Sequence, residues 1–452
     1  MTHPEAGAAS ISEGTPDVGD TEGSTPAVTN PRRALAVVIG VVFIDLVGFG
    51  IVIPILPFYV RSFGVSDAFI GLLAASYSLA QFLSAPYLGR LSDRLGRRPV
   101  LLASLSTAAV AWVVFGFASE ADAAFGTAAA LATLFASRTL AGAMGGNIAA
   151  AQAYVADITP PEERAGALGL IGASFALGFV FGPAIGGLLA ADAVVARADA
   201  VFPAFVPATP YSIPSFAAAG MSLLAVLAGH RFLEEPRRNR TAGVRVTFVG
   251  TFRNALASPT LRPITVAYFV VAVAFAGVQV MFIPYVADLY GYDATAAAFL
   301  LTYVGVLGAM NQGVLVGRLS RVVPSRTLAA AGAALLACAL AALPFTAGVG
   351  RGVAVGGPTW LTGPLVALLV VLATLSLGNA LVNVSLATLV STSTDAAGQG
   401  AAFGVTQGAA SLGRTVGPPL MAVLYTVAYA SPFLVGALLL VPVAVAFVRR
   451  TG

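Results

Sequence analysis

Twelve apolar runs, each long enough to cross a bilayer as an α-helix, dominate this sequence. They lie at roughly 34–60, 68–88, 99–118, 126–154, 166–190, 211–230, 262–287, 295–316, 326–348, 360–388, 401–428 and 431–448. Only 10% of the 452 residues are charged, whereas soluble domains carry about 25%. Membrane β-barrels show short alternating segments instead of such long runs. The sequence therefore predicts an all-α polytopic membrane protein with twelve transmembrane helices.

The positions of the arginines predict how these helices are oriented. All 24 basic residues are arginine, and in a twelve-helix arrangement 19 of them lie on the side that holds the N-terminus. The opposite side holds Arg61, Arg197 and Arg351, while Arg138 and Arg414 lie inside spans. An excess of basic residues marks cytoplasmic loops. We therefore expect a multi-pass protein of the cell (plasma) membrane with both termini in the cytoplasm.

The two halves of the chain repeat one another. A glycine and a proline seven residues apart occur at 50 and 57 and again at 277 and 284. The tetrapeptide Gly-Arg-Leu-Ser follows at 89–92 and 317–320, and Gly-Pro at 182–183 and 417–418. Such six-helix repeats are typical of transporters that rock two halves about a central site. We predict a disordered cytoplasmic tail at 1–33, an N-terminal six-helix bundle at 34–230, a cytoplasmic central loop at 231–261 and a C-terminal six-helix bundle at 262–449.

Several classes of function lack the residues they need. Without lysine the chain has neither a Walker-type phosphate loop nor a lysine Schiff base. His3, His230 and the single Cys338 do not make a metal cluster or a disulfide. Loop orientation explains the net charge of +4 without a nucleic-acid partner. We expect no enzyme activity, no cofactor and no metal, and a lipid bilayer, protons and a small-molecule substrate as partners of a monomer.

A charged segment at residues 89–99 separates the second and third apolar runs. We predict a cytoplasmic hairpin loop in which Asp93 begins a helix, caps it and pairs with arginines across the interface between the bundles. The alternative is a turn whose arginines only fix the orientation of the protein. The residues assigned to this cytoplasmic gate are Gly89, Asp93, Arg94, Gly96, Arg97 and Arg98.

Asp45 is the one acid of 20 that lies well inside a predicted span. An isolated ionised acid at that depth costs about 2.5–3.5 kcal/mol, so it must be neutral, paired or hydrated. Burial favours the protonated form, which suits a group that loads and releases a proton. The repeat places Ala272 at the equivalent position in the second half. We assign Asp45 and Arg138 to proton coupling, with a purely structural pair as the alternative.

Other polar residues inside spans define a candidate substrate cavity. Arg414 is interpreted either as a cation of that cavity or as a link to backbone carbonyls of a neighbouring helix. For the uncharged residues the alternative is a hydrogen bond between helices. The residues assigned to the substrate cavity are Asn147, Gln152, Gln279, Asn311, Gln312, Asn379, Asn383 and Arg414.

Glycines recur at every fourth position of the fifth span. Stripes of small residues let helix backbones approach closely, and a proline after a glycine favours a bend. Packing alone and a role in gating are both open interpretations. The residues concerned are Gly178, Gly182, Pro183, Gly186 and Gly187.

The chain resembles the major facilitator superfamily, and within it the twelve-helix drug:proton antiporters that include the tetracycline-efflux proteins. The resemblance rests on the segments 89–98, 45–57 and 178–187 and on Arg138 with Gly142. It implies the major facilitator fold, a latch at 89–98 that closes the cytoplasmic side in the outward-facing state, and an antiporter signature in the fifth span. Tetracycline exporters carry a second acid in helix three, where we align Ala111, and a histidine near the seventh helix, where this chain has none.

From these features we expect a secondary active transporter that exports a small amphipathic molecule or drug in exchange for protons by alternating access. One alternative is a proton symporter or facilitator for a sugar or organic acid. The other is a membrane sensor or scaffold that transports nothing. Intramembrane charges and repeated cytoplasmic loops favour transport, because a scaffold needs neither.

Overall fold

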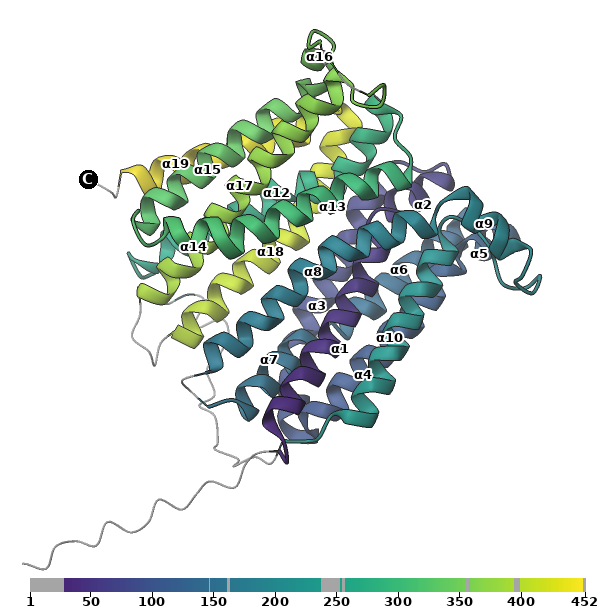
Figure 1. The fold of residues 1–452 in the computed structure, drawn as a ribbon, viewed down its shortest axis with the longest axis horizontal. Coiled ribbons are helices and arrows are strands. Elements are labelled where there is room, and N and C mark those ends of the chain that lie inside the picture. Colours follow the sequence, from purple (N-terminus) through teal and green to yellow (C-terminus); the bar gives the residue numbers. More distant parts are fainter. Residues whose placement is uncertain are drawn as a thin grey trace, which may run out of the picture.

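The computed structural model describes residues 28–449 except 146, 161–162, 237–252, 254–256, 355, 357 and 394–398. Throughout these residues the chain forms helices joined by turns and loops (Figure 1). The helices of the first half are α1 (Pro31–Val52), α2 (Leu56–Ser62), α3 (Ala68–Leu95), α4 (Arg97–Gly116), α5 (Ala118–Phe125), α6 (Thr127–Ala143), α7 (Asn147–Ile158), α8 (Arg164–Leu189), α9 (Asp192–Asp199) and α10 (Ser212–Phe232).

The second half begins with α12 (Leu261–Tyr290) and α13 (Ala294–Met310), which continues through the π-helix η1 (Asn311–Leu315) into α14 (Val316–Leu319). It is completed by α15 (Ser325–Ala342), the 3₁₀-helix η2 (Leu343–Phe345), α16 (Thr346–Gly350), α17 (Gly363–Thr392), α18 (Gln399–Val427) and α19 (Ser431–Val448).

Ten stretches of helix in the described part of the chain are long and apolar enough to span a membrane. They coincide with ten of the twelve predicted spans. The predicted span 126–154 corresponds to α6 and α7, and the predicted span 401–428 corresponds to α18. The prediction of an all-α polytopic membrane protein is therefore confirmed.

Breaks in the helices were not predicted, and they have local causes. Pro54 and Pro57 lack the N–H group that continues a helix, and the first span divides near them into α1 and α2. The fourth span divides into α6 and α7 after Ala143, at a glycine pair whose first member is Gly145. Discontinuous helices are typical of transporter binding sites, because they expose backbone groups to a cavity.

The helices pack in two groups that follow the order of the chain (Figure 1). In the first, α1 packs on α8 and α10, α10 on α4, and α3 on α6. In the second, α12 packs on α18 and α19, and α15 on α17 and α19. The groups meet where α3 contacts α18 and where α8 contacts α13. We call the side on which α1 begins the tail side, and the side that carries α2, α5, α9 and α16 the far side.

The glycine stripe of α8 lies directly against α1. A Cβ atom added to Gly178 would lie 2.8 Å from the Leu46 Cβ, and one added to Gly182 would lie 2.5 Å from the Gly50 Cα. Gly187 instead faces α13, where the Thr295 hydroxyl donates to the Gly187 carbonyl at 2.9 Å. Helix α8 therefore joins the two groups of helices, with its small residues against α1.

This contact predicts a stability difference between two glycines of the same helix. Gly182→Ala should lower the thermal unfolding midpoint of detergent-solubilised protein, because the added methyl group overpacks α1 at a cost of about 1–3 kcal/mol. Gly172→Ala is the matched control, since its Cβ meets no atom within 4 Å and alanine favours helix by up to about 1 kcal/mol. Equal midpoints for the two variants would contradict the packing.

Candidate functional site

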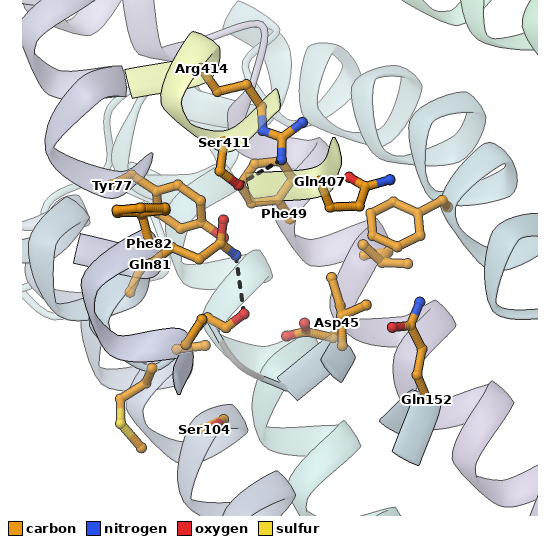
Figure 2. Close-up of a pocket in the computed structure, with 18 of the residues that line it drawn as sticks. Asp45, Phe49, Tyr77, Gln81, Phe82, Ser104, Gln152, Gln407, Ser411 and Arg414 are labelled. Carbon is orange, nitrogen blue, oxygen red and sulfur yellow. Dashed lines mark hydrogen bonds between the residues drawn. The ribbon is translucent and has the colours of Figure 1, made fainter. Parts of the chain in front are cut away.

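A cavity of about 1350 Å³ lies between the two groups of helices. Its walls come from α1, α3, α4, α6, α7 and α8 on one side and from α18 on the other (Figure 2). Toward the tail side it reaches Gln152, Leu168 and Gly404, which lie in or near the tail-side ends of their helices. The cavity therefore extends from mid-span toward the tail side.

Among the described residues, two that are charged line this cavity, Asp45 and Arg414. Asp45 lies in α1, and its Oδ1 accepts a hydrogen bond of 3.4 Å from the hydroxyl of Ser222 in α10. Arg414 projects into the cavity from α18 and donates to the Ser411 hydroxyl at 3.0 Å (Figure 2). Asp45 and Arg414 therefore bring opposite charges into one cavity from different halves of the chain.

Arg138 does not line the cavity but lies behind its wall. Its guanidinium carbon lies 4.1 Å from the ring centre of Trp112 and 4.8 Å from that of Phe115. It also donates to the Ser137 hydroxyl at 3.4 Å, and among the described residues no carboxylate lies within ion-pair distance of it. Two aromatic faces stabilise this buried cation by cation–π interaction. The direct pair of Arg138 with Asp45, one of the sequence-based alternatives, is therefore not formed in this conformation.

Of the other residues assigned to the cavity, Gln152 lines it, and the side chain of Asn147 lies outside the described residues. The remaining five lie outside the cavity lining: Gln279, Asn311, Gln312, Asn379 and Asn383. Asn311 donates to the Ser376 hydroxyl at 3.3 Å, and Asn383 donates to the Asn379 carbonyl and side-chain oxygens at 2.8 and 2.9 Å. The bond of Asn311 joins two helices, as the alternative interpretation of the sequence has it, whereas the bonds between Asn383 and Asn379 lie within α17.

Several lining residues were missed by the sequence analysis. Gln81 in α3 donates to the Gly145 carbonyl at 3.1 Å, at the break between α6 and α7 (Figure 2). Gln407 shares the cavity-facing side of α18 with Ser411 and Arg414. Both glutamines lie inside predicted spans, so the criterion that selected Gln152 would also have selected them. Tyr77 carries no comparable signal, because tyrosines inside spans are common packing residues.

The predicted hairpin loop at 89–99 is wrong in its form. Helix α3 continues to Leu95, α4 begins at Arg97, and only Gly96, with φ +114°, separates them. Asp93 therefore lies in the last turn of α3 and does not begin a helix. It pairs with Arg97 at 2.7 Å, and Arg97 also contacts Asp157 at 3.0 Å, all within the first group of helices. Helix formation prevails because a single glycine with positive φ suffices to reverse the chain direction.

The cap of α4 comes from Glu235 instead, just beyond α10. Its carboxylate oxygens accept hydrogen bonds of 2.8 Å from the backbone N–H groups of Arg97 and Arg98. The same carboxylate lies 2.7 Å from the position of a Cβ at Gly96, which explains the glycine there. Arg98 also donates to the His230 carbonyl at 2.7 Å. These contacts fix the tail-side end of the first group of helices.

On the far side, four residues form what we call the far-side charge cluster: Arg61, Asp67, Asp288 and Tyr425. Arg61 in α2 binds Asp67 with two hydrogen bonds of 2.7 Å and Asp288 in α12 with bonds of 2.7 and 2.9 Å. The Tyr425 hydroxyl in α18 donates to Asp288 at 2.6 Å. This cluster ties the two groups of helices together. No sequence pattern indicates it, because Arg61 and Asp288 are 227 residues apart.

Close packing closes the same side. A Cβ at Gly71 in α3 would lie 2.5 Å from the Ala422 Cβ in α18, and one at Gly187 would lie 2.6 Å from the Ala298 Cβ in α13. On the tail side, Gly404 at the cavity and Gly89 near the end of α3 meet no atom within 4 Å of an added Cβ. In the described part of the chain, these contacts close the cavity on the far side, and the cavity extends toward the tail side.

Comparison with known proteins identifies the family. The profile of the Major Facilitator Superfamily matches residues 38–361. The chain is 34% identical to the tetracycline resistance protein, class C, of Escherichia coli over 63% of this chain and 67% of that protein. It is 28% identical to the class B tetracycline resistance protein of the same species, covering 88% and 89% of the two chains.

A solved structure of a bacterial homologue of the human lysosomal transporter Spinster, inward-facing and occupied, has the same fold. Its TM-score is 0.74 at 16% identity, over 94% of this chain and 98% of that one. Two groups of helices around a central cavity are an arrangement found in membrane transporters. The chain belongs to the Major Facilitator Superfamily, and is thus a multi-pass membrane transporter related to drug-resistance proteins.

Proposed function

We propose that this protein is a proton-coupled exporter of a small amphipathic molecule that works by alternating access. The tail side is then the cytoplasmic side of the plasma membrane, which agrees with the 19 arginines of the corresponding loops and termini. Similarity to tetracycline resistance proteins supports export of a drug-like molecule. The protein acts as a monomer in this proposal.

The observation that carries the proposal is the position of Asp45. In the part of the chain that the structure describes, it is the one carboxylate that lines the cavity between the two groups of helices. When the cavity closes and loses water, an ionised carboxylate there costs about 2.5–3.5 kcal/mol unless a cation compensates it. When the cavity closes during the conformational change, Asp45 is therefore either protonated or has a substrate group beside it. Exchange of one for the other couples proton import to substrate export.

Alternating access also requires that the cavity be closed on the far side in one conformation and on the cytoplasmic side in the other. In the present conformation the far-side charge cluster and the contacts of Gly71 and Gly187 close the far side. In the outward-facing conformation we propose that these contacts separate and that the segment 89–98 closes the cytoplasmic side. The glycine stripe of α8 then serves as the surface on which α1 and α8 stay packed during the movement.

Purified protein in liposomes tests this function. The liposomes contain a trapped pH indicator, and an imposed pH gradient drives exchange. Probes of different charge are added in turn: tetracycline, ethidium, 2-naphthoate and glucose. A proton antiporter should give proton movement opposite to that of at least one drug-like probe. Substrate movement in the same direction as protons, or movement of glucose without protons, would contradict the proposal.

A further inference from the structure

Arg414 brings a positive charge into the cavity, and its guanidinium group has few partners there. The Arg414 guanidinium has five N–H donors, and its one hydrogen bond to a described residue goes to the uncharged Ser411 hydroxyl. Among the described residues no carboxylate lies within ion-pair distance of it. The second cation, Arg138, lies behind the Trp112 wall. An unneutralised guanidinium in a cavity within the membrane favours an anionic partner, which it binds with two parallel hydrogen bonds.

Asp45 provides the opposite charge on a different helix and a different wall. Figure 2 shows Asp45 and Arg414 on separate sides of the cavity, with Phe49 and Tyr77 lining it nearby. Asp45 and Arg414 are not within ion-pair distance of one another, so a ligand can lie between them. A ligand that presents a complementary charge to each of them carries an anionic and a cationic group on one molecule.

The walls between these charges fit a flat apolar body. Phe49, Tyr77, Phe82 and Trp112 line the cavity, and Phe49 lies 5.9 Å from Tyr77 and 6.4 Å from Trp112 between ring centres. Aromatic faces at such spacing contribute apolar area and favourable ring contacts. The cavity is also larger than most small-molecule sites, which hold about 300–1,000 Å³. It therefore has room for a polycyclic ligand.

We propose that the substrate class is an aromatic zwitterion, with its anionic group on Arg414 and its ammonium group on Asp45. The proposal rests on the proposed function, because it takes this cavity as the transport site. Gln81 and Gln407 lie beside the ligand as uncharged hydrogen-bond partners. We specify one cationic group because Asp45 is the one carboxylate among the described lining residues.

Proton coupling explains why a singly charged anion fits less well. An ammonium group beside Asp45 stabilises its ionised form, so binding expels the proton from Asp45 into solution. A ligand with only a carboxylate gains most when Asp45 is protonated and neutral, so it binds together with the proton. Only the zwitterion both occupies Arg414 and competes with the proton, as an antiporter requires.

Equilibrium binding to four ligands with one ring system tests the proposal. The ligands are 6-(aminomethyl)-2-naphthoate (zwitterion), 2-naphthoate (anion), 2-naphthylmethylamine (cation) and 2-naphthylmethanol (neutral). The chain has two tryptophans, and Trp360 is 68% exposed outside the cavity. In a Trp360→Phe background, quenching of Trp112 fluorescence in detergent reports binding in the cavity. We expect the zwitterion to bind roughly 10- to 100-fold more tightly than either singly charged ligand.

Substitutions assign each charge to its residue. Arg414→Gln should remove the advantage of the carboxylate, and Asp45→Asn the advantage of the ammonium group, each by roughly 10-fold or more. Arg414→Lys retains the charge and should retain most of the zwitterion affinity. Arg318→Gln, at an exposed arginine on the tail side, is the matched control and should bind as the parent does.

Each result decides the proposal. It is overturned if the cation or the anion binds as tightly as the zwitterion, or if Arg414→Gln keeps the preference for the carboxylate. Zwitterion preference without proton-driven transport in liposomes would contradict the proposed function and leave the substrate class standing. Proton-driven transport of ethidium together with equal binding of all four naphthalene ligands would overturn the substrate class alone.

Discussion

Asp45→Asn should reduce proton-driven substrate accumulation in liposomes to the level of protein-free liposomes, while exchange of substrate for substrate continues. Asparagine has the size of aspartate and resembles its protonated form, so the cavity keeps its shape. It cannot release a proton, and it removes the cost of about 2.5–3.5 kcal/mol for an ionised group inside a span. The two conformations then interconvert freely, and transport no longer depends on the pH gradient.

Gradient-driven uptake and counterflow measured on the same liposomes separate these effects. Asp45→Glu is the control within the site, because it keeps a titratable carboxyl group and should keep part of the coupling. Asp199→Asn removes an exposed acid of the far side and should transport as the parent does. Full proton-driven accumulation by Asp45→Asn would exclude Asp45 as the proton carrier.

Arg61→Gln should shift the protein from the inward-facing toward the outward-facing conformation. In the parent protein, Arg61 lies 2.7 Å from a carboxylate oxygen of Asp67 and 2.7 Å from one of Asp288. The substitution leaves these two acids facing one another without the cation that bridges them. The side chains of Arg61 and Asp288 are 25% and 43% exposed, so solvent screens part of the loss. We expect a change of about 1–2 kcal/mol, or a factor of roughly 5–30 in the ratio of the two conformations.

Distances between two spin labels measure this ratio. Phe125 at the end of α5 and Val427 at the end of α18 are 82% and 78% exposed on the far side, and they belong to different groups of helices. With Cys338→Ser in the background, labels at Phe125→Cys and Val427→Cys should show a longer-distance population that grows on Arg61→Gln. Asp288→Asn should change it in the same direction.

The control for this prediction is Arg197→Gln, which removes another arginine of the far side that is exposed and lies in α9. Its distance distribution should match that of the parent. An unchanged distribution in both Arg61→Gln and Asp288→Asn would show that the far-side charge cluster does not hold the two halves together.

Hydrophobic patterning predicts most of this fold. Backbone N–H and C=O groups inside a bilayer must form hydrogen bonds within their own segment, so each long apolar run becomes a helix. The predicted ends of α19 coincide with the observed ones, and those of α10 and α18 differ by one or two residues. The connection at 89–99 was misjudged because charge and glycine were taken as signs of a loop. Charged residues continue a helix equally well beyond the membrane surface, as the last turns of α3 do.

The candidate site was less predictable, since it depends on which face each helix turns toward its neighbours. Asp45 and Arg414 stand out in sequence because charges inside spans are rare. Uncharged polar residues are less informative, since Gln279 and Asn383 also lie inside predicted spans but do not line the cavity. The pairing of Arg61 with Asp288 follows only from the assembled halves, and stacking of Arg138 on Trp112 required knowledge of how α4 and α6 pack.

Proton release on ligand binding tests the central claim most directly. Detergent-solubilised protein in weakly buffered solution is mixed with 6-(aminomethyl)-2-naphthoate, tetracycline or ethidium, and the pH change is recorded between about pH 5 and pH 9. The account predicts release of up to about one proton per bound ligand for at least one probe, lost in Asp45→Asn. Release of the same size from Asp45→Asn, or binding of all three ligands without release at any pH in this range, would contradict it.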